Sequence, residues 1–317
     1  MFKHVFFAFL LSGSLLTAQG IVRSGYTGPA PVSVAPGQIA TFYVAGLRAL
    51  TGITATLQQN GSTPAPVQSV TTVSLCPDVT VTPVTGCGTQ TAVTVQIPYE
   101  LVTPCPLCER PISAALATLL ISQNGLALGA IELNPVGDEV HVLTACDIAL
   151  DQSSNPPLPS LNGLPCSPLV THTDGTLVSA SSPANVGEAL TVWAFGLGQT
   201  TPAATTGQPA TMAPAAETFN LDFNYQVNAL AAKPFTGSPD HIPLVPLFAG
   251  LAPGYVGLYQ FNFVVPPQPP NGTPRCALPG TVGPGADFAQ SNFTVSIGGQ
   301  FSFDGAGICV ATQIPVD

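Results

Sequence analysis

Histidine is the side chain best suited to general acid–base chemistry near neutral pH. The chain has only four histidines, and the three that follow the N-terminal segment, His141, His172 and His241, stand in different parts of the sequence. A Ser-His-Asp triad can assemble from distant segments, but no Gly-x-Ser-x-Gly turn that would expose a serine nucleophile occurs. His172, close to Asp174 and Gly175, is typical of a polar turn. The pattern predicts a protein that is not an enzyme, with an unrecognised hydrolase as an alternative.

Cys105 and Cys108 form a Cys-x-x-Cys pair, which is a candidate for redox chemistry or zinc binding. A redox pair of the thioredoxin kind opens a helix, whose N-terminus lowers the thiol pKa, whereas three prolines surround this pair. A zinc site needs a second close pair or a Cys/His set, and the preceding two cysteines are too widely spaced to supply one. The motif therefore predicts a structural disulfide, with a redox enzyme as the alternative and no metal or other cofactor.

Four aromatic residues late in the chain are candidates for a sugar-binding surface. Tyr255, Tyr259, Phe261 and Phe263 have the same parity, so on a strand they would face one side. We expect this side to be the hydrophobic core. The alternative is a stacking platform for sugar rings at Tyr255 and Tyr259, because tyrosine combines an apolar ring with a polar tip.

Acidic residues come closest to a cluster at Asp138, Glu139, Asp147 and Asp151. Calcium needs several oxygen atoms that converge on one point, and neither an EF-hand nor a repeated Asp-x-Asp pattern is present. Solvated loop acids are therefore expected, with a calcium site as the alternative.

The net charge is −10, with only six Lys and Arg residues among 317. Binding to duplex nucleic acid needs clustered cations that displace counterions, and anionic membrane surfaces attract basic segments. The composition therefore disfavours both as partners.

The first 20 residues are typical of a secretory signal peptide, because Lys3 precedes a short apolar run and small residues follow it. The run is shorter than the roughly 20 residues of a membrane helix. We therefore expect cleavage and export, to the periplasm, the cell surface or the medium. An even number of cysteines in an exported chain indicates disulfides. Proximity in the sequence favours Cys76 with Cys87, Cys105 with Cys108, Cys146 with Cys166 and Cys276 with Cys309.

An internal repeat organises the rest of the chain. Residues 35–47 align with residues 185–197, and each copy predicts a turn followed by a strand, at 39–44 and at 189–195. A second pair of strands stops at Pro98 and at Pro266, because proline cannot donate to a ladder. A third pair enters tight turns at 124–125 and 298–299.

Two copies of one unit predict an all-β protein with two immunoglobulin-like β-sandwich domains in tandem, stapled by disulfides. A single larger sandwich or barrel is the alternative. The Pro- and Ser-rich stretch that begins at residue 151 is typical of a linker. The predicted organisation is a signal peptide (1–20), an N-terminal domain (21–150), a linker (151–168) and a C-terminal domain (169–317).

The second unit also contains a set of short motifs, HTDGTLVS from residue 172, NVGE from 185, GLGQTTP from 196, LFAGLAPGYVGLYQ from 247 and VSIGG from 295. This set resembles a family of acidobacterial exported proteins, first described from Solibacter as a C-terminal domain of unknown function. Residues 35–134 are similar to the module that often precedes it. The resemblance implies an immunoglobulin-like sandwich on an exported bacterial protein, and it implies no activity. The eight cysteines and the insertions at 228–244 and 269–286 depart from the family pattern.

These observations predict a non-catalytic secreted or cell-surface protein that acts as a structural, adhesion or interaction module. Its partner would be an unknown protein or polysaccharide at the cell surface. The alternatives are a carbohydrate-binding module that uses Tyr255 and Tyr259, and an unrecognised hydrolase or redox enzyme.

Overall fold

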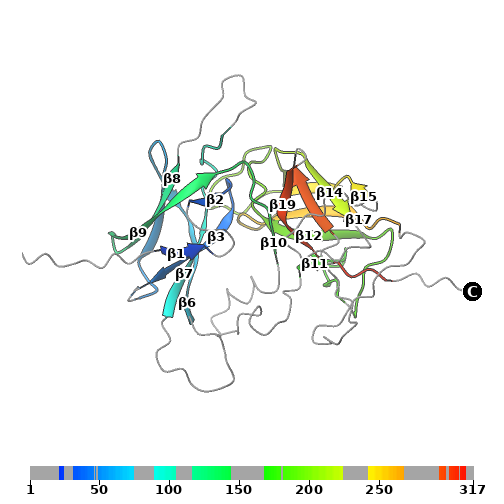
Figure 1. Cartoon of the computed structure of the whole chain (residues 1–317), viewed down its shortest axis with the longest axis horizontal. Helices are drawn as coiled ribbons and strands as arrows, with labels where there is room; N and C mark the ends of the chain where they lie inside the picture. Colours follow the sequence, from blue (N-terminus) through cyan, green and yellow to red (C-terminus); the bar gives the residue numbers. More distant parts are fainter. Residues whose placement is uncertain are drawn as a thin grey trace, which may run out of the picture.

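The structure is a computed structural model that describes residues 21–24, 31–45, 47, 49–74, 89–104, 116–143, 168–179, 181–223, 242–267, 293–297, 300–306 and 308–311. These residues form four β-sheets, none of which closes into a barrel (Figure 1). The prediction of an all-β fold is confirmed for them. No helix capable of crossing a bilayer occurs in the part of the chain described here.

Two of the sheets form the N-terminal sheet pair. Their strand orders are β1-β3-β7-β6 and β2-β9-β8-β4-β5. Side chains from both sheets form one hydrophobic core, with Phe42 and Val93 from the first sheet and Leu57, Leu119 and Ile121 from the second. The strands are β1 (Ile21–Ser24), β2 (Val32–Val34), β3 (Ile39–Ala45), β4 (Ile53–Gln58), β5 (Ser62–Ala65), β6 (Val67–Ser74), β7 (Thr89–Gln96), β8 (Ala117–Gln123) and β9 (Leu126–Pro135).

The other two sheets form the C-terminal sheet pair, with strand orders β10-β12-β17-β16-β13 and β15-β14-β18-β19, and β11 beside β12. Their common core is rich in phenylalanine: Phe261 lies edge-on to Phe219, and Phe263 stacks on Phe293. The strands are β10 (His141–Val142), β11 (Val170–Thr171), β12 (Ala189–Phe195), β13 (Ala213–Pro214), β14 (Phe219–Phe223), β15 (Ile242–Leu244), β16 (Phe248–Leu251), β17 (Tyr259–Val264), β18 (Phe293–Ile297) and β19 (Gln300–Ala306).

The strand pairings of the two sheet pairs correspond. The ladder β1-β3-β7-β6 has its counterpart in β10-β12-β17-β16, and β9-β8-β4-β5 has its counterpart in β19-β18-β14-β15. Even the parallel pairing of β2 with β9 recurs, as an isolated parallel bridge between Ala184 and Val310. The sequence repeat is thus a repeat of the whole pairing scheme.

The turn before β3 and the turn before β12 correspond in their glycine φ angles and in a backbone hydrogen bond. Gly37 and Gly187 have φ angles of 75° and 80°. The N–H of Gly37 donates to the Ile97 carbonyl, and the N–H of Gly187 donates to the Val265 carbonyl, each at 2.9 Å. Because a positive φ is costly for residues with a Cβ, glycine suits both turns. The strands predicted at 39–44 and 189–195 are confirmed.

The first hairpin turn is also confirmed. Asn124 and Gly125 have φ angles of 50° and 79° and connect β8 to β9. Positive φ at both central residues is typical of the type I′ turn of a tight two-residue hairpin. The corresponding turn predicted at 298–299 lies outside the described residues.

The chain passes from one sheet pair to the other within a few residues. The N–H of Val136 donates to the Val34 carbonyl, whereas the N–H of Glu139 already donates to the Gly196 carbonyl. β10 then pairs with β12. Residues 136–142 therefore contact first one sheet pair and then the other. The predicted domain bounds, which were based on the Pro- and Ser-rich stretch from residue 151, stay a prediction. The predicted linker, except residue 168, lies outside the described residues.

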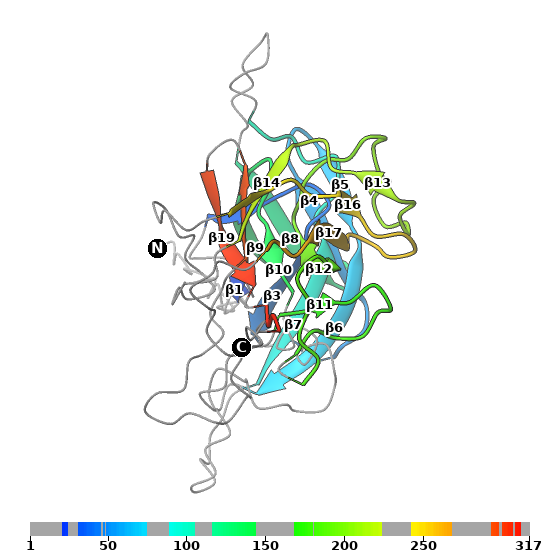
Figure 2. The same ribbon diagram turned by 90° about the vertical axis from the view of Figure 1, so that its right-hand side faces the viewer.

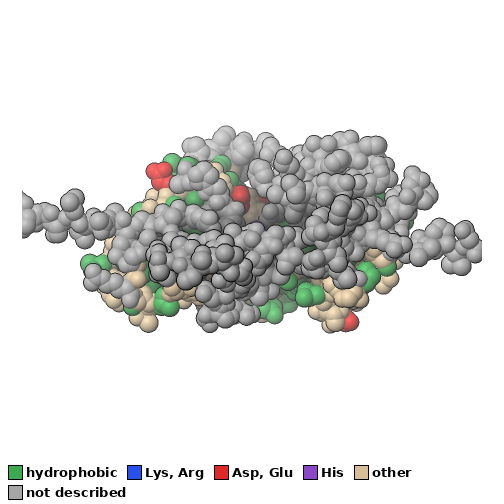
Figure 3. All heavy atoms as spheres, turned by 60° about the horizontal axis from the view of Figure 1, so that its bottom comes forward, with side chains coloured by type: hydrophobic (Ala, Val, Ile, Leu, Met, Phe, Trp, Pro, Cys, Tyr) green, Lys and Arg blue, Asp and Glu red, His purple; other side chains and the backbone are tan. Residues whose placement is uncertain are grey.

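Charged side chains are sparse on the described surface. Arg23 is the only one of the six Lys and Arg residues that falls within the described ranges. On the face shown in Figure 3, the coloured atoms are mainly hydrophobic or neutral, with a few Asp and Glu side chains. Figure 2 shows β6, in light blue, running toward the lower end of that view.

The two equivalent glycines allow a matched test of the fold. A Cβ added at Gly187 would meet nothing within 4 Å, whereas one at Gly37 would lie 2.2 Å from the ring of Tyr99. Gly187→Ala should lower the free energy of unfolding by about 1–2 kcal/mol, the cost of a left-handed residue. Gly37→Ala should cost clearly more, because it also displaces a buried ring. Urea denaturation measures both, and equal losses would contradict the close packing of Tyr99 on Gly37.

Candidate functional site

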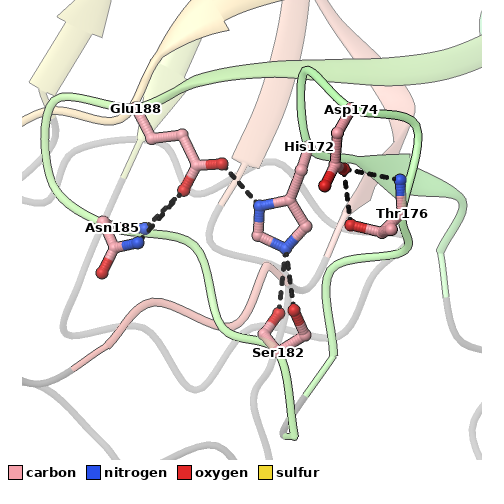
Figure 4. A network of polar contacts seen from close by, with 6 residues as sticks. All are labelled: His172, Asp174, Thr176, Ser182, Asn185 and Glu188. Carbon is pink, nitrogen blue, oxygen red and sulfur yellow. Dashed lines mark hydrogen bonds and ion pairs between the residues drawn. The ribbon is translucent and has the colours of Figure 1, made fainter.

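A network of polar side chains surrounds His172 on the segment that leads into β12 (Figure 4). His172 Nδ1 lies 2.5 Å from Glu188 Oε1. His172 Nε2 lies 3.1 Å from the backbone oxygen of Ser182 and 3.3 Å from its hydroxyl oxygen. Glu188 Oε2 accepts a hydrogen bond from the backbone N–H of Asn185 at 2.8 Å. The network therefore ties two turns to the beginning of β12.

The polar turn predicted at His172 is confirmed. The N–H of Gly175 donates to the His172 carbonyl at 3.0 Å, and Gly175 has a φ of 84°. Asp174 Oδ1 accepts hydrogen bonds from both the backbone N–H and the hydroxyl of Thr176, at 2.9 and 2.6 Å. The sequence did not identify Ser182 and Glu188 as partners of His172.

The electrostatics of the network favour a charged pair. The hydrogen bond from Glu188 raises the pKa of His172, and this outweighs the opposing effect of burial. Burial raises the pKa of Glu188, but its hydrogen bonds from Asn185 and His172 together lower that pKa below the ordinary value of 4.5. Both shifts favour the ion pair of a protonated His172 ring with an ionised Glu188.

Ser182, His172 and Glu188 have the connectivity of a hydrolase triad, but the hydrogen bonds favour another role. A general base needs an Nε2 lone pair directed at the serine hydroxyl. Here both ring nitrogens face oxygen acceptors, a carboxylate and a backbone carbonyl, which favours the ring as a donor at both positions. The N–H of Ser182 donates to the Ser179 carbonyl at 3.1 Å, so it does not point at a developing oxyanion. We interpret these residues as a clasp on the loop before β12.

The other predicted histidines do not join this network. His141 lies in β10 opposite Phe195, at the far end of β12 from Glu188. His241 lies outside the described residues. Among the described residues, no three His, Cys, Asp or Glu side chains are grouped so that they could hold a metal ion.

The second polar cluster lies where the two sheet pairs meet, and its centre is a pair of tyrosines. The hydroxyl of Tyr259 donates to the Gly198 carbonyl at 2.5 Å and lies 3.2 Å from the hydroxyl of Tyr99. Since the single proton of Tyr259 is directed at Gly198, Tyr99 is the donor between the two hydroxyls. Tyr99, which follows β7, belongs to the core of the C-terminal sheet pair. Burial raises the pKa of both phenols, and most strongly that of Tyr259.

A loop of the C-terminal sheet pair is hydrogen-bonded to the end of β7 around these tyrosines. Gln199 Nε2 donates to the Tyr99 carbonyl at 2.5 Å, and the Tyr99 N–H donates to Thr206 Oγ1 at 2.9 Å. The N–H of Gly207 donates to Gln96 Oε1 at 2.6 Å, and the hydroxyl of Thr206 donates to Glu100. We call residues 96–100 together with 198–207 and Tyr259 the junction. It provides several direct hydrogen bonds in addition to the apolar contact of Tyr99.

The junction corrects the prediction of a sugar-binding platform. Tyr259, Phe261 and Phe263 are all fully buried, which confirms the expectation that they face the core. Tyr259 therefore has no ring face to offer a sugar. Tyr255 is 59% exposed, but it lies in the turn before β17 and does not share the strand face of the other three. The equal parity of the four positions did not show that the strand begins only at Tyr259, so that Tyr255 lies outside it.

Of the predicted acidic cluster, only Asp138 and Glu139 are described, and they lie where the chain crosses between the sheet pairs. Burial raises the pKa of Asp138 to about 6, and the nearby Glu217 carboxylate adds to this effect. Of the eight cysteines, only Cys309 is described, and its sulfur is disulfide-bonded. The seven others, including the Cys105–Cys108 motif, lie outside the described residues, so the pairing scheme stays a prediction.

Comparison with protein-family models and with curated proteins finds no match for this chain. The family resemblance suggested by the sequence motifs therefore stays a prediction.

The clasp predicts a specific dependence of stability on pH. The pKa of His172 is raised on folding, so its contribution is full below the ordinary value of 6.5 and is lost as the pH rises through the folded pKa. The pKa of Glu188 is lowered, so its contribution is lost as the pH falls through that lower value. His172→Gln should therefore cost up to about 1 kcal/mol near pH 6 and less near pH 9.

Urea midpoints at both pH values measure this difference. Ser182→Ala is the matched control, because it leaves the backbone carbonyl in place and should preserve the pH dependence. An equal effect of His172→Gln at both pH values would contradict a charged clasp.

The direction of the tyrosine hydrogen bonds makes a second prediction. Tyr259→Phe leaves the Gly198 carbonyl and the Tyr99 hydroxyl buried without partners, which should cost about 1–3 kcal/mol for each group. Tyr99→Phe leaves the bond from Tyr259 to Gly198 intact and should cost about 1 kcal/mol. Denaturant unfolding compares the two variants, and a larger loss for Tyr99→Phe would show that the donor assignment is wrong.

Proposed function

We propose that this protein is a non-catalytic, exported structural or interaction module of the cell surface. In this proposal, two immunoglobulin-like β-sandwiches are held by the junction as one rigid body, after removal of a signal peptide. The partner would be a protein or polysaccharide of the cell envelope, and no cofactor is needed.

The sheet orders support the immunoglobulin-like assignment. An immunoglobulin domain has one sheet with the order A-B-E-D and a second built from G, F and C, with an added C′ strand in variable-type domains. The order β1-β3-β7-β6 fits A-B-E-D in chain order, and β9-β8-β4-β5 fits G-F-C-C′. The C-terminal sheet pair fits the same scheme with β10-β12-β17-β16 and β19-β18-β14-β15.

The junction is the observation that carries the proposal of a rigid module. Neighbouring domains in one chain ordinarily move relative to one another unless their interface is large or well packed. Here Tyr99 of the N-terminal sheet pair is buried in the core of the C-terminal one. Separation of the two halves would move the Tyr99 ring from this core into water, which loses the stabilisation that its burial provides. Relative motion of the two halves would break this arrangement, so a fixed orientation is favoured, as suits a spacer or scaffold.

The described chemistry favours this function over the alternatives. The His172 network has its donors and acceptors satisfied as a clasp, which argues against a hydrolase. A redox role would depend on Cys105 and Cys108, and a sugar platform would now depend on Tyr255 alone. A single exposed ring supplies much less stacking surface than the pair that the sequence suggested.

The proposal is tested by incubating the exported chain with cell envelopes of the producing organism and with a panel of insoluble polysaccharides. We expect retention on the envelope that Tyr255→Ala leaves unchanged. Retention on a polysaccharide that is competed by its soluble oligomer and lost in Tyr255→Ala would support the sugar-binding alternative instead. Hydrolysis of activated esters that is lost in Ser182→Ala would overturn the non-catalytic assignment.

A further inference from the structure

The chain crosses from one sheet pair to the other on a segment, residues 137–139, that is packed backbone against backbone. The N–H of Glu139 donates to the Gly196 carbonyl at 2.8 Å. The carbonyl oxygen of Gly137 lies so close to Gly198 that a Cβ there would clash with it, and a Cβ at Gly196 would clash with the carbonyl oxygen of Glu139. The position of this crossing segment is therefore set by direct contact with the two glycines.

The backbone that the crossing segment contacts also leads into the junction. The carbonyl of Gly198 accepts the hydrogen bond from the Tyr259 hydroxyl. The next residue, Gln199, donates from its side chain to the Tyr99 carbonyl. A displacement of the crossing segment from Gly198 would therefore disturb the hydrogen bonds that hold the two sheet pairs together.

Two carboxylates are held near this backbone. Asp138 is the middle residue of the crossing segment and is partly buried. The N–H of Ala216 donates to the Gln199 carbonyl at 2.8 Å, which places Glu217 beside the same stretch. Burial raises the pKa of Asp138 to about 6, and the charge of Glu217 adds to this effect. Above that pH, an ionised Asp138 lacks full hydration and lies near a like charge, and both cost free energy.

We infer that the crossing is a pH switch, in which protonation of Asp138 strengthens the contact between the two sheet pairs and ionisation of Asp138 weakens it. An ionised carboxylate regains hydration if the crossing segment moves away from Gly198, and this movement also reduces its repulsion by Glu217. Protons shift the equilibrium toward the state that binds them better, which is the closed contact. This inference does not depend on the proposed function.

The other titratable groups near the crossing do not offset this effect. They are acids, phenols and one histidine: Glu139 and His141 beside Asp138, Glu217 before β14, and Tyr99, Glu100 and Tyr259 at the junction. Burial raises the pKa of both phenols, so neither ionises in the relevant range. No lysine or arginine is among these described groups, and the charge that acts on Asp138 is that of Glu217.

The pH range of the switch follows from the two pKa values of Asp138, about 6 in the folded protein and 3.8 as the ordinary value. The contribution to stability is fully present below 3.8 and is lost as the pH rises through about 6. The clasp acts in other ranges. Glu188 loses its contribution as the pH falls through a value below 4.5, and His172 loses its contribution as the pH rises through a value above 6.5.

The first test compares the stability of variants at pH 4 and pH 7.5 by urea denaturation of the full chain. Asp138→Asn should match the wild type at pH 4 and unfold less readily at pH 7.5. The two pKa values set an upper limit of about 100-fold on the unfolding equilibrium constant, and because Asp138 is partly exposed we expect roughly tenfold. Glu217→Gln should give a smaller gain at pH 7.5. The matched control is Glu132→Gln, which removes an exposed carboxylate from β9 and should keep the pH dependence of the wild type.

The second test is amide hydrogen exchange at the junction, corrected for the intrinsic effect of pH on exchange. The Gly207 N–H, donated to Gln96, and the Tyr99 N–H, donated to Thr206, report this contact directly. Their protection should fall between pH 4 and pH 7.5 in the wild type and stay constant in Asp138→Asn, with amides of the β3–β7 ladder as the reference.

Equal stability of Asp138→Asn and the wild type at pH 7.5 overturns the inference. So does a fall in junction protection that persists in Asp138→Asn, because another group would then be the sensor. If Asp138→Asn fails to fold, Glu217→Gln decides, and the absence of any gain at pH 7.5 overturns the inference.

Discussion

The hydrogen bond between Tyr99 and Tyr259 is the interaction on which the relation between the two sheet pairs depends. Tyr259 lies on β17, the central strand of its sheet, with a fully buried side chain. A buried phenol is tolerated only when its hydroxyl is hydrogen-bonded, and here the partners are the Gly198 carbonyl and Tyr99. The positions of β17, the loop after Gly198 and the end of β7 are therefore coupled. Gly37 is part of the same constraint, because only a residue without a Cβ leaves room for the Tyr99 ring.

The two halves share one scaffold, and their differences lie at equivalent positions. Gln38 and Glu188 both accept a hydrogen bond from the backbone three residues earlier, at 2.8 Å in each case. Gln38 is buried and neutral, whereas Glu188 lies near the surface and holds His172. Two residues beyond the matching Ile97 and Val265, one copy has Tyr99 and the other has Pro267. The junction therefore arises from divergence at the end of a shared strand.

The parts that could be predicted from the sequence are those governed by local chemistry. Alternating β-branched residues marked β3 and β12, and Asn124-Gly125 marked a hairpin turn, because strand propensity and positive φ act over a few residues. Tyr99 was not recognised, because it follows a proline in a loop and its partner is 160 residues away. Glu188 and His172 are 16 residues apart on irregular backbone, where no periodicity relates them. The sequence predicts Tyr259 in the core, as found, but a sugar-binding surface stays open as the alternative, because parity separates the two sides of a strand and does not say which side is covered.

The placement of Tyr99 in the core of the other half has a consequence for the order in which the protein is made. A chain is synthesised from its N-terminus, so the N-terminal sheet pair emerges before β17 and the loop that contains Gln199 and Thr206. Until those residues arrive, Tyr99 has neither its apolar surroundings nor the partners for its hydroxyl and backbone groups. The first half therefore reaches its full set of contacts only after the second half has been synthesised, although its own strands are already available. The two halves have the same strand pairing, but the first cannot complete its packing independently of the second.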